Sequence, residues 1–415
     1  MSDSEQSAPG ETTCLSRQPI LDSQRDLFGY ELSLWTSGRA VAEHSQENTA
    51  MLVCAAYAEL GVRSALGRHK AFLRIDPVFL QDDAIEALPA EGVVLQLAFE
   101  SAPDGASLER CRVLRERRYL LALAAYNGLD ERSSPFLSMV HFIRIDVRGK
   151  DVRQLLELAG PLARLPIGLL AHGVETSDDF ARARDAGFRF FQGYFFARPE
   201  IVSGRRLTAS QISLIRLINL TAHDTDSTRI EEAFKRDPAL AVKLLAIVNS
   251  VAYCASRRIG SLRQAIQVLG YRQLRRWLYL LLLTPNGKAA DVSRTPLLQM
   301  AALRARMMEL LIDRVIPGDT ALAGQAVITG LMSMMPAALG LPAKEIFDLI
   351  LLEREIVAAL KSRAGLLGRM LALIECYDAE DATGCARILA GFAGLDRNLL
   401  NASLIDALRW INAEI

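Results

Sequence analysis

The chain has 415 residues, of which 51% are hydrophobic and 23% charged, and its 48 basic residues balance its 48 acidic residues. A chain of this length exceeds one ordinary hydrophobic core, so we expect two domains. The zero net charge gives no general reason to expect nucleic acid or an anionic membrane as a partner.

Residues 1–12 contain neither a basic start nor an apolar stretch, so we expect a disordered tail there rather than a secretion signal. The six cysteines are scattered without paired spacing, which argues against a disulfide framework or a zinc site. The longest strongly apolar run, Leu278–Leu283, falls far short of the roughly 20 residues that a membrane span needs. These features predict a cytoplasmic protein without a membrane span.

Short apolar runs recur between residues 13 and 200. They lie at 29–35, 70–76, 93–99, 119–126, 141–146, 168–175 and 188–196. Stretches long enough for a helix separate them, which is typical of parallel strands in an α/β layer or barrel. In such folds the chemistry sits at the C-terminal ends of the strands. Those ends carry Trp35, Arg74, Gln96, Ala124 and Ala125, whereas a hydrolytic metal site would need oxygen anions.

After about residue 200 the apolar residues follow helical spacing. Asp237 and Pro238 predict the start of one helix, because aspartate caps a helix and proline fits its first turn. Ser261 opens another helix, which Gly270 ends before a third begins at Tyr271. Further helical patterns lie at 296–315, 320–338, 344–362, 364–377 and 403–413. The second half is therefore predicted to be an all-α bundle, with domains at 13–203 and 204–415.

The string RQPILDSQRDLFGYELSLW at 17–35, followed by RIDP at 74–77, GVET at 173–176 and FQGYFFARP at 191–199, resembles the EAL domain. That family consists of barrel-fold phosphodiesterases that cleave the bacterial messenger cyclic di-GMP. The resemblance spans about 13–200 and implies an abbreviated TIM-like (β/α) barrel, because a full one takes about 250 residues. It also implies divalent cations held by oxygen ligands, which generate the attacking hydroxide.

Matched position by position, the resemblance keeps Glu31, Glu175 and Gln192. The other family positions are changed: Trp35 replaces a phosphate-facing basic residue, Arg74 an asparagine, Gln96 a glutamate, Ala124 and Ala125 the paired aspartates, and Arg144 a lysine. Too few anionic ligands remain for a metal pair, so we expect no metal, no cofactor and no phosphodiesterase activity. We hypothesise that Arg74, with Arg144 as a second candidate, forms a salt bridge with the retained glutamates. The alternative is a solvated Arg74 and an ordinary surface contact for Glu31.

The string RDPALAVKLLAIVNSVAYCASRRIGSLRQAIQVLGYRQLRRWLYLLL at 236–282 resembles the HDOD domain. This domain is an all-helical relative of metal-dependent HD phosphohydrolases and lacks their His and Asp ligands. The dipeptide His223-Asp224 lies in a polar stretch, and the helical half has no other histidine, so we expect no catalysis there. Together the two halves resemble the tandem EAL–HDOD signalling architecture of bacteria.

A basic segment lies within the helical half. Between residues 238 and 290 there are eight basic residues and no acidic one: Lys243, Arg257, Arg258, Arg263, Arg272, Arg275, Arg276 and Lys288. One interpretation is that they flank buried helices and balance acids elsewhere, such as those at 227–237. The other is that the arginines form a patch for an acidic partner or an anion. Nucleic acid is less favoured, because aromatic residues for base stacking are sparse.

We therefore expect a non-catalytic adaptor in bacterial cyclic di-GMP-related signalling, acting through contacts with other signalling proteins. One alternative is a receptor that binds cyclic di-GMP without cleaving it. Another is a hydrolase built on an acid set such as Glu31, Glu100, Asp146 and Glu175. The sequence names neither the partner nor the oligomeric state.

Overall fold

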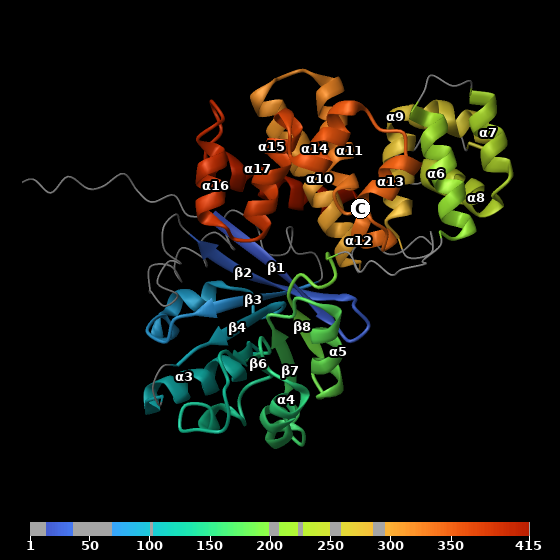
Figure 1. The fold of residues 1–415 in the computed structure, drawn as a ribbon. Helices are drawn as coiled ribbons and strands as arrows, with labels where there is room; N and C mark the ends of the chain where they lie inside the picture. Colours follow the sequence, from blue (N-terminus) through green and yellow to red (C-terminus); the bar gives the residue numbers. More distant parts are fainter. Residues whose placement is uncertain are drawn as a thin grey trace, which may run out of the picture. The chain divides into compact units, whose positions relative to one another are not determined.

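The computed structural model describes residues 14–35, 69–99, 103–198, 207–222, 227–249, 259–284 and 295–414. They belong to two compact units (Figure 1), the first made of the chain up to Phe195 together with Glu375–Ile415, and the second of Phe196–Ile374. The segment 375–415, which the sequence analysis assigns to the helical domain, thus belongs to the barrel unit, and the domain boundaries stay a prediction. The predicted tail at 1–12 and His223-Asp224 lie outside the described residues.

The first unit contains a closed barrel whose strands follow one another in chain order. The strands are β1 (Cys14–Asp22), β2 (Leu27–Trp35), β3 (Lys70–Ile75), β4 (Val93–Leu97), β5 (Leu120–Leu123), β6 (Phe142–Asp146), β7 (Gly168–His172) and β8 (Phe190–Gln192). Strands β2 to β8 pair in parallel, which confirms the TIM-like barrel.

The first strand departs from the predicted parallel pattern, because β1 is antiparallel to both β2 and β8. Only a tight turn links β1 to β2, and such a short connection requires antiparallel neighbours. The Asp22 carboxylate stabilises this turn by accepting hydrogen bonds from the backbone N–H groups of Gln24 and Asp26, at 2.9 and 3.0 Å. The apolar runs in the sequence begin at residue 29, so β1 was not predicted, whereas the seven runs that were predicted pair in parallel as β2 to β8.

The described helices around the barrel are short. They are α3 (Gly105–Glu116), α4 (Val152–Ala159) and α5 (Ser177–Asp185), together with the 3-10 turns η2 (Phe79–Gln81), η3 (Asp83–Ala87), η4 (Ser134–Phe136) and η5 (Gly160–Leu162). Side chains cap all three α-helices: Asp104, Asp151 and Thr176 each accept a backbone N–H of the first turn. These caps fix where each helix starts after its strand.

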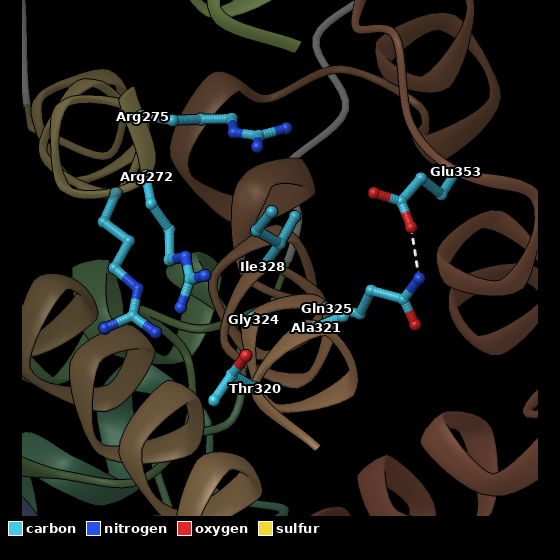
Figure 2. Close-up of a pocket in the computed structure, with 9 residues that line it drawn as sticks. Arg272, Arg275, Thr320, Ala321, Gly324, Gln325, Ile328 and Glu353 are labelled. Carbon is cyan, nitrogen blue, oxygen red and sulfur yellow. Dashed lines mark hydrogen bonds between the residues drawn. The ribbon is translucent and has the colours of Figure 1, made fainter. Parts of the chain in front are cut away.

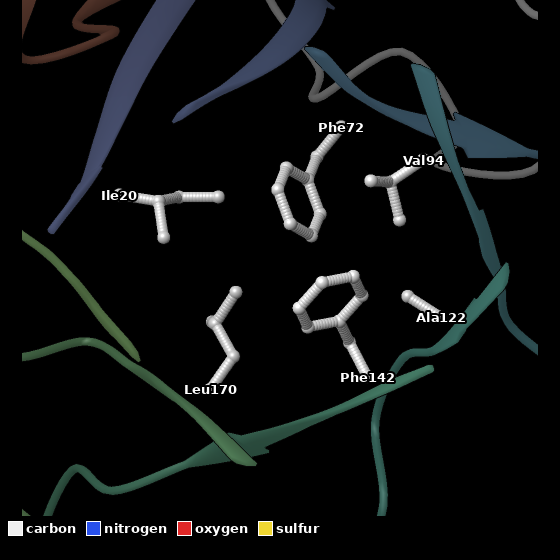
Figure 3. Close-up of a cluster of buried hydrophobic side chains, with 6 residues drawn as sticks. All are labelled: Ile20, Phe72, Val94, Ala122, Phe142 and Leu170. Carbon is white, nitrogen blue, oxygen red and sulfur yellow. The ribbon is translucent and has the colours of Figure 1, made fainter. Parts of the chain in front are cut away.

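One layer of apolar side chains fills the barrel interior (Figure 3). The residues are Ile20, Phe72, Val94, Ala122, Phe142 and Leu170, and none is more than 8% exposed. Side chains alternate along a strand, so on the parallel strands β3 to β7 the residue two positions further on also points inward, nearer the strand's C-terminal end. Those next residues are Arg74, Gln96, Ala124, Arg144 and His172. The apolar layer is thus the floor under a polar mouth.

The C-terminal part of the first unit packs beside β1. It contains the end of α15 (Gly365–Asp378), then α16 (Ala382–Leu389) and α17 (Arg397–Glu414), and α17 contacts β1. The Tyr194 hydroxyl, just after β8, donates a hydrogen bond to the backbone carbonyl of Asp378. Buried leucines of α17, among them Leu400 and Leu408, supply its apolar face. Helix α16 was not predicted from the sequence.

The second unit is all-α, as predicted. Its helices are α6 (Ala209–Ala222), α7 (Ser227–Lys235), α8 (Pro238–Val248), α9 (Leu262–Leu282), α10 (Pro296–Val315), α11 (Thr320–Met332), α12 (Met335–Leu339), α13 (Ala343–Leu349), α14 (Arg354–Ser362) and most of α15. The Asp237 carboxylate accepts the Leu240 N–H at 3.2 Å, and the Ser261 hydroxyl accepts the Gln264 N–H at 3.2 Å. Gly270 has a φ of 74° and breaks α9. All three local signals are therefore confirmed.

One helical stretch of the second unit, Thr320–Leu339, has the length and apolarity of a membrane span. Its mean hydropathy is 1.4, and 56% of it is buried inside the protein. Core helices share this composition, and Met332 and Met335 are fully buried in this stretch. It is therefore weak evidence for a span.

Candidate functional site

A polar cavity of about 440 Å³ opens at the C-terminal ends of the barrel strands. It is lined by Gln18, Glu31, Ser33, Arg74, Ala125, Arg144, Asp146, Arg148, His172 and Glu380. Its volume lies in the range of pockets that hold small molecules. The fold thus brings together Glu31, Arg74, Ala125 and Arg144, which the sequence analysis selected one by one.

The centre of the mouth is a salt bridge across the barrel. Arg144 on β6 places Nη1 at 3.1 Å from Oε1 of Glu31 on β2, and each side chain is 11% exposed. The Gln192 amide donates to the other oxygen of Glu31 and, at 2.9 Å, to Oε1 of Gln18. The hypothesised salt bridge is therefore present, and its basic partner is Arg144. Arg74 lines the same cavity.

These neighbours keep Glu31 charged. Burial opposes ionisation of the carboxyl group, but Arg144, the Gln192 hydrogen bond and Arg74 outweigh burial and hold the pKa of Glu31 below its usual value. A buried carboxylate is tolerated when it is paired and hydrogen-bonded in this way. The Glu31 carboxylate thus pairs with an arginine and is not exposed as a ligand for a metal ion.

A second pair lies at the end of β6. Arg148 Nη2 is 2.5 Å from Oδ2 of Asp146, and its Nε is 3.0 Å from Oδ1. Burial opposes ionisation of Asp146, but the hydrogen bonds from Arg148 lower its pKa to about 2. Gly173 packs against this arginine: a Cβ there would lie 2.6 Å from Cγ of Arg148, and its φ is 78°. The glycine of the GVET motif therefore makes room for Arg148.

His172 enters the mouth as a neutral imidazole. Burial and the neighbouring Arg144 charge lower the pKa of His172 to about 4, although Glu31 and Asp146 act in the opposite direction. At neutral pH the ring therefore carries no charge and offers one donor and one acceptor.

The alanines in place of the family's paired aspartates leave no oxygen at this point of the mouth. Ala124 is 4% exposed, and Ala125 lines the cavity. The backbone of Ala125 is left-handed, with a φ of 56°. Aspartate and asparagine are enriched in this conformation, whereas alanine rarely adopts it.

Gln96 is fully buried on β4, between Arg74 of β3 and Ala122 of β5. Within the described part of the chain, neither atom of its amide has a hydrogen-bond partner. Leaving a buried polar group unsatisfied costs about 1–3 kcal/mol. A water molecule or a ligand group would satisfy this amide.

We tested whether the mouth fits the divalent cations implied by the EAL resemblance. Across the described ranges, no three side chains of His, Cys, Asp or Glu lie together as a group that could hold a metal ion. Arg144 forms a salt bridge with Glu31, which engages this carboxylate. Glu175 is exposed just before α5 and does not line the cavity. The described residues do not fit a two-metal centre. Glu100 and the side chain of Trp35 lie outside the described residues.

Glu380 is a lining residue that the sequence analysis missed. It follows α15, has a φ of 56°, and its Oε1 accepts hydrogen bonds from Ser33 Oγ at 3.3 Å and Gln18 Nε2 at 3.4 Å. The Ser16 hydroxyl also donates to it. No local pattern reveals this contact, because more than three hundred residues separate the partners in the sequence.

Only some of the arginines of the basic segment in the helical half lie around one cavity. Arg257 and Arg258 lie outside the described residues, and Arg263 pairs with Glu231 at 3.0 Å. Arg272, Arg275 and Arg276 line a second cavity, of about 200 Å³, within the second unit.

Known proteins resemble the chain along nearly all its length. The HDOD domain model matches residues 208–338. A Vibrio cholerae protein named cyclic di-GMP phosphodiesterase CdgJ is 30% identical over 410 residues, 96% of this chain and 92% of the relative. The uncharacterized protein YuxH of Bacillus subtilis is 24% identical over 406 residues, 95% of this chain and 97% of the relative.

Solved structures resemble the chain at a lower level. The Klebsiella pneumoniae BlrP1 calcium/cyclic di-GMP complex has a TM-score of 0.39 and 18% identity, covering 46% of this chain and 58% of that one. A standalone EAL protein of Vibrio cholerae O395, in its cyclic di-GMP-bound form, has a TM-score of 0.36 and 18% identity, covering 46% and 93%.

The Vibrio cholerae relative overturns the expectation of a non-catalytic adaptor, and with it the expectation that the chain is not an enzyme. A match of 30% identity over nearly the whole length to a named phosphodiesterase points to an enzyme. That expectation rested on the changed motif positions, whereas the similarity to the named phosphodiesterase extends over 96% of the chain. The chain belongs to the tandem EAL–HDOD family, with an EAL-type barrel first and an HDOD domain second.

Proposed function

We propose that the chain acts on cyclic di-GMP, which it binds at the barrel mouth and hydrolyses. The observation that carries the binding is the presence of Arg74, Arg144 and Arg148 around one cavity of about 440 Å³. Guanidinium groups bind phosphate oxygens through paired, charge-assisted hydrogen bonds. The name of the Vibrio cholerae relative supports both the ligand and its hydrolysis.

The arginines are not equally available to the ligand. Arg144 holds the buried Glu31, whereas Arg148 is 59% exposed and pairs with a 38% exposed Asp146. Exposed pairs contribute little to stability and rearrange at small cost. In this proposal Arg148, together with Arg74 in the lining of the same cavity, binds the phosphate, and Arg144 is a positioning residue for Glu31.

The negative charge of Glu380 disfavours the binding of cyclic di-GMP. Its carboxylate lines the same cavity, where it accepts hydrogen bonds from neutral donors. A carboxylate repels a phosphodiester group, so Glu380→Gln is expected to tighten the binding of cyclic di-GMP. Arg74→Gln is expected to weaken it tenfold or more.

We propose hydrolysis of cyclic di-GMP because the Vibrio cholerae relative is named a phosphodiesterase, and not because of a metal site. The described residues of the mouth do not fit a divalent pair. The residues of the chain bind and orient the phosphodiester beside Glu31, Asp146 and the neutral His172.

Turnover and binding are tested separately with the full chain. Cyclic di-GMP is incubated with the protein in Mg²⁺, in Mn²⁺ and in chelator, and the linear dinucleotide is measured by chromatography. The proposal predicts linear product that decreases in Arg74→Gln. Binding without product under every condition would refute the hydrolysis, and absence of both would refute the ligand.

We also propose that the protein works in the cytoplasm. The described cysteines Cys111, Cys376 and Cys385 are free thiols, which favours a reducing compartment. Contact with other signalling proteins stays a prediction.

A further inference from the structure

The cavity of about 200 Å³ in the helical unit has an unusual lining. Its walls come from α9, α11 and the start of α14, and it is lined by Arg272, Arg275, Arg276, Thr320, Ala321, Gly324, Gln325, Ile328 and Glu353. Figure 2 shows the side chains of Arg272 and Arg275 on one side and those of Gln325 and Glu353 on the other. We propose that this cavity binds the dianionic phosphate group of a small phosphomonoester.

The charge of the lining favours an anion. It holds the guanidinium groups of Arg272, Arg275 and Arg276 against the single carboxylate of Glu353. Arg276 pairs with Glu309, 2.9 Å away on α10, and Glu309 also pairs with Arg306. Across the part of the chain that the structure describes, Arg272 and Arg275 form no ion pair of their own. Glu353 accepts a hydrogen bond from the amide of Gln325.

The close spacing of the arginines destabilises α9 through charge repulsion, and a bound anion would offset this repulsion. Arg272 and Arg275 are three positions apart on α9, and Arg272 and Arg276 are four apart, so like charges occupy one helix face. Like charges that are neighbours on one helix face destabilise the helix. A bound phosphate would turn this repulsion into charge-assisted hydrogen bonds.

The cavity's size indicates how much of a ligand it encloses. Pockets for drug-sized molecules are about 300–1,000 Å³, which is larger than this one. The cavity suits a phosphate group with little else, so the rest of the molecule would lie outside. Thr320, at the first position of α11, adds a hydroxyl donor at the wall.

The barrel mouth is a separate site in the other unit, and this proposal does not depend on the binding of cyclic di-GMP. The structure offers matched variants for the test. Arg275→Gln removes a half-buried cavity arginine. Arg263→Gln removes an arginine of the same helix that pairs with Glu231 outside the cavity. Arg74→Gln removes an arginine of the barrel mouth.

The experiment is a calorimetric titration of the full chain with inorganic phosphate and with 5′-GMP, at constant ionic strength and with chloride as the reference anion. We expect phosphate binding that is at least tenfold weaker in Arg275→Gln and unchanged in Arg263→Gln. Glu353→Gln is expected to bind more tightly, since the competing carboxylate is removed.

Circular dichroism without phosphate shows whether each variant is folded. Should Arg275→Gln fail to fold, Arg272→Gln and Glu353→Gln test the same cavity. No binding by the folded wild-type chain, or equal loss in Arg263→Gln and Arg275→Gln, would overturn the proposal. Loss in Arg74→Gln alone would place the phosphate in the barrel instead.

Discussion

Arg144 and Glu31 face each other across the barrel mouth, with Nη1 and Oε1 3.1 Å apart, although more than a hundred residues separate them in the sequence. Both side chains are 11% exposed, and Arg144 is the charge that most favours the ionised form of Glu31. Glu31 is the glutamate that the EAL resemblance retains, and its pairing with an arginine changes what it can do. Through this salt bridge Glu31 stabilises the structure of the barrel mouth.

Removing the arginine alone is expected to be costly. Arg144→Gln leaves Glu31 charged and buried without its main partner, and breaking a buried pair in this way costs about 3–5 kcal/mol. The double variant Arg144→Gln/Glu31→Gln is expected to recover part of that loss, because no unpaired charge remains. Urea unfolding of the wild type, both single variants and the double variant measures this coupling. Equal stability of Arg144→Gln and the wild type would contradict it.

Acid is expected to destabilise the fold through His172 first. The folded pKa is lowered to about 4 from 6.5, so the unfolded chain binds the proton in this window and the folded chain does not. Stability should therefore fall as the pH decreases from 6.5 to 4. Thermal unfolding across this range should show a shallower slope in His172→Gln than in the wild type. An unchanged slope would show that His172 is already charged in the folded state.

Glu31 adds a second loss at lower pH. Its folded pKa lies below the ordinary value of 4.5, so its contribution is present above that value and disappears as the pH falls through the folded pKa. Glu31→Gln should remove this part of the acid sensitivity, while the part between pH 6.5 and 4 persists, because losing Glu31 lowers the pKa of His172 further. Identical acid profiles for Glu31→Gln and the wild type would argue against the paired carboxylate.

The left-handed backbone of Ala125 can be tested by substitution. Its φ of 56° strains an alanine by about 1–2 kcal/mol, whereas asparagine tolerates this conformation. Ala125→Asn is expected to match or exceed the wild-type stability, and Ala125→Val to lower it by at least about 1 kcal/mol. Chemical denaturation compares the three proteins. A more stable valine variant would mean that the strain is absent.

Restoring the family's acids tests what their loss does to the mouth. Ala124→Asp/Ala125→Asp adds oxygen ligands beside the cavity, and hard cations bind such ligands. Mn²⁺ binding followed by calorimetry is expected to appear or strengthen at least tenfold, with faster release of linear product. A matched Ala124→Asn/Ala125→Asn variant controls for the added volume without the charge. Equal metal binding by both variants would show that charge is not what the mouth lacks.

Much of the fold can be predicted from local signals. Asp237, Ser261 and Gly270 mark helix ends by their own conformational chemistry, and the structure places each as predicted. Gly193 of the FQGYFF motif also has a steric reason, because a Cβ there would lie 1.9 Å from the carbonyl oxygen of Val174. Such constraints act over a few residues and remain readable in the sequence.

The site was less predictable, because its composition depends on distant contacts. Motif matching selected Arg74 and Arg144, but which of them pairs with Glu31 depends on the barrel closing. Glu380 joins the mouth from the far end of the chain, where no motif points to it. The antiparallel β1 was missed for a related reason: pairing direction follows from the short turn at Asp22–Leu27 and not from an apolar run.

Binding at the barrel mouth is tested most directly by a calorimetric titration of cyclic di-GMP into the full chain, Arg74→Gln and Arg153→Gln. Arg153 is a surface arginine, 87% exposed, on α4 and serves as the matched control. We predict one nucleotide site per barrel, weakened tenfold or more by Arg74→Gln and unaffected by Arg153→Gln. No detectable binding to the folded wild type, or the same affinity in all three proteins, would contradict the claim that the barrel mouth recognises this nucleotide.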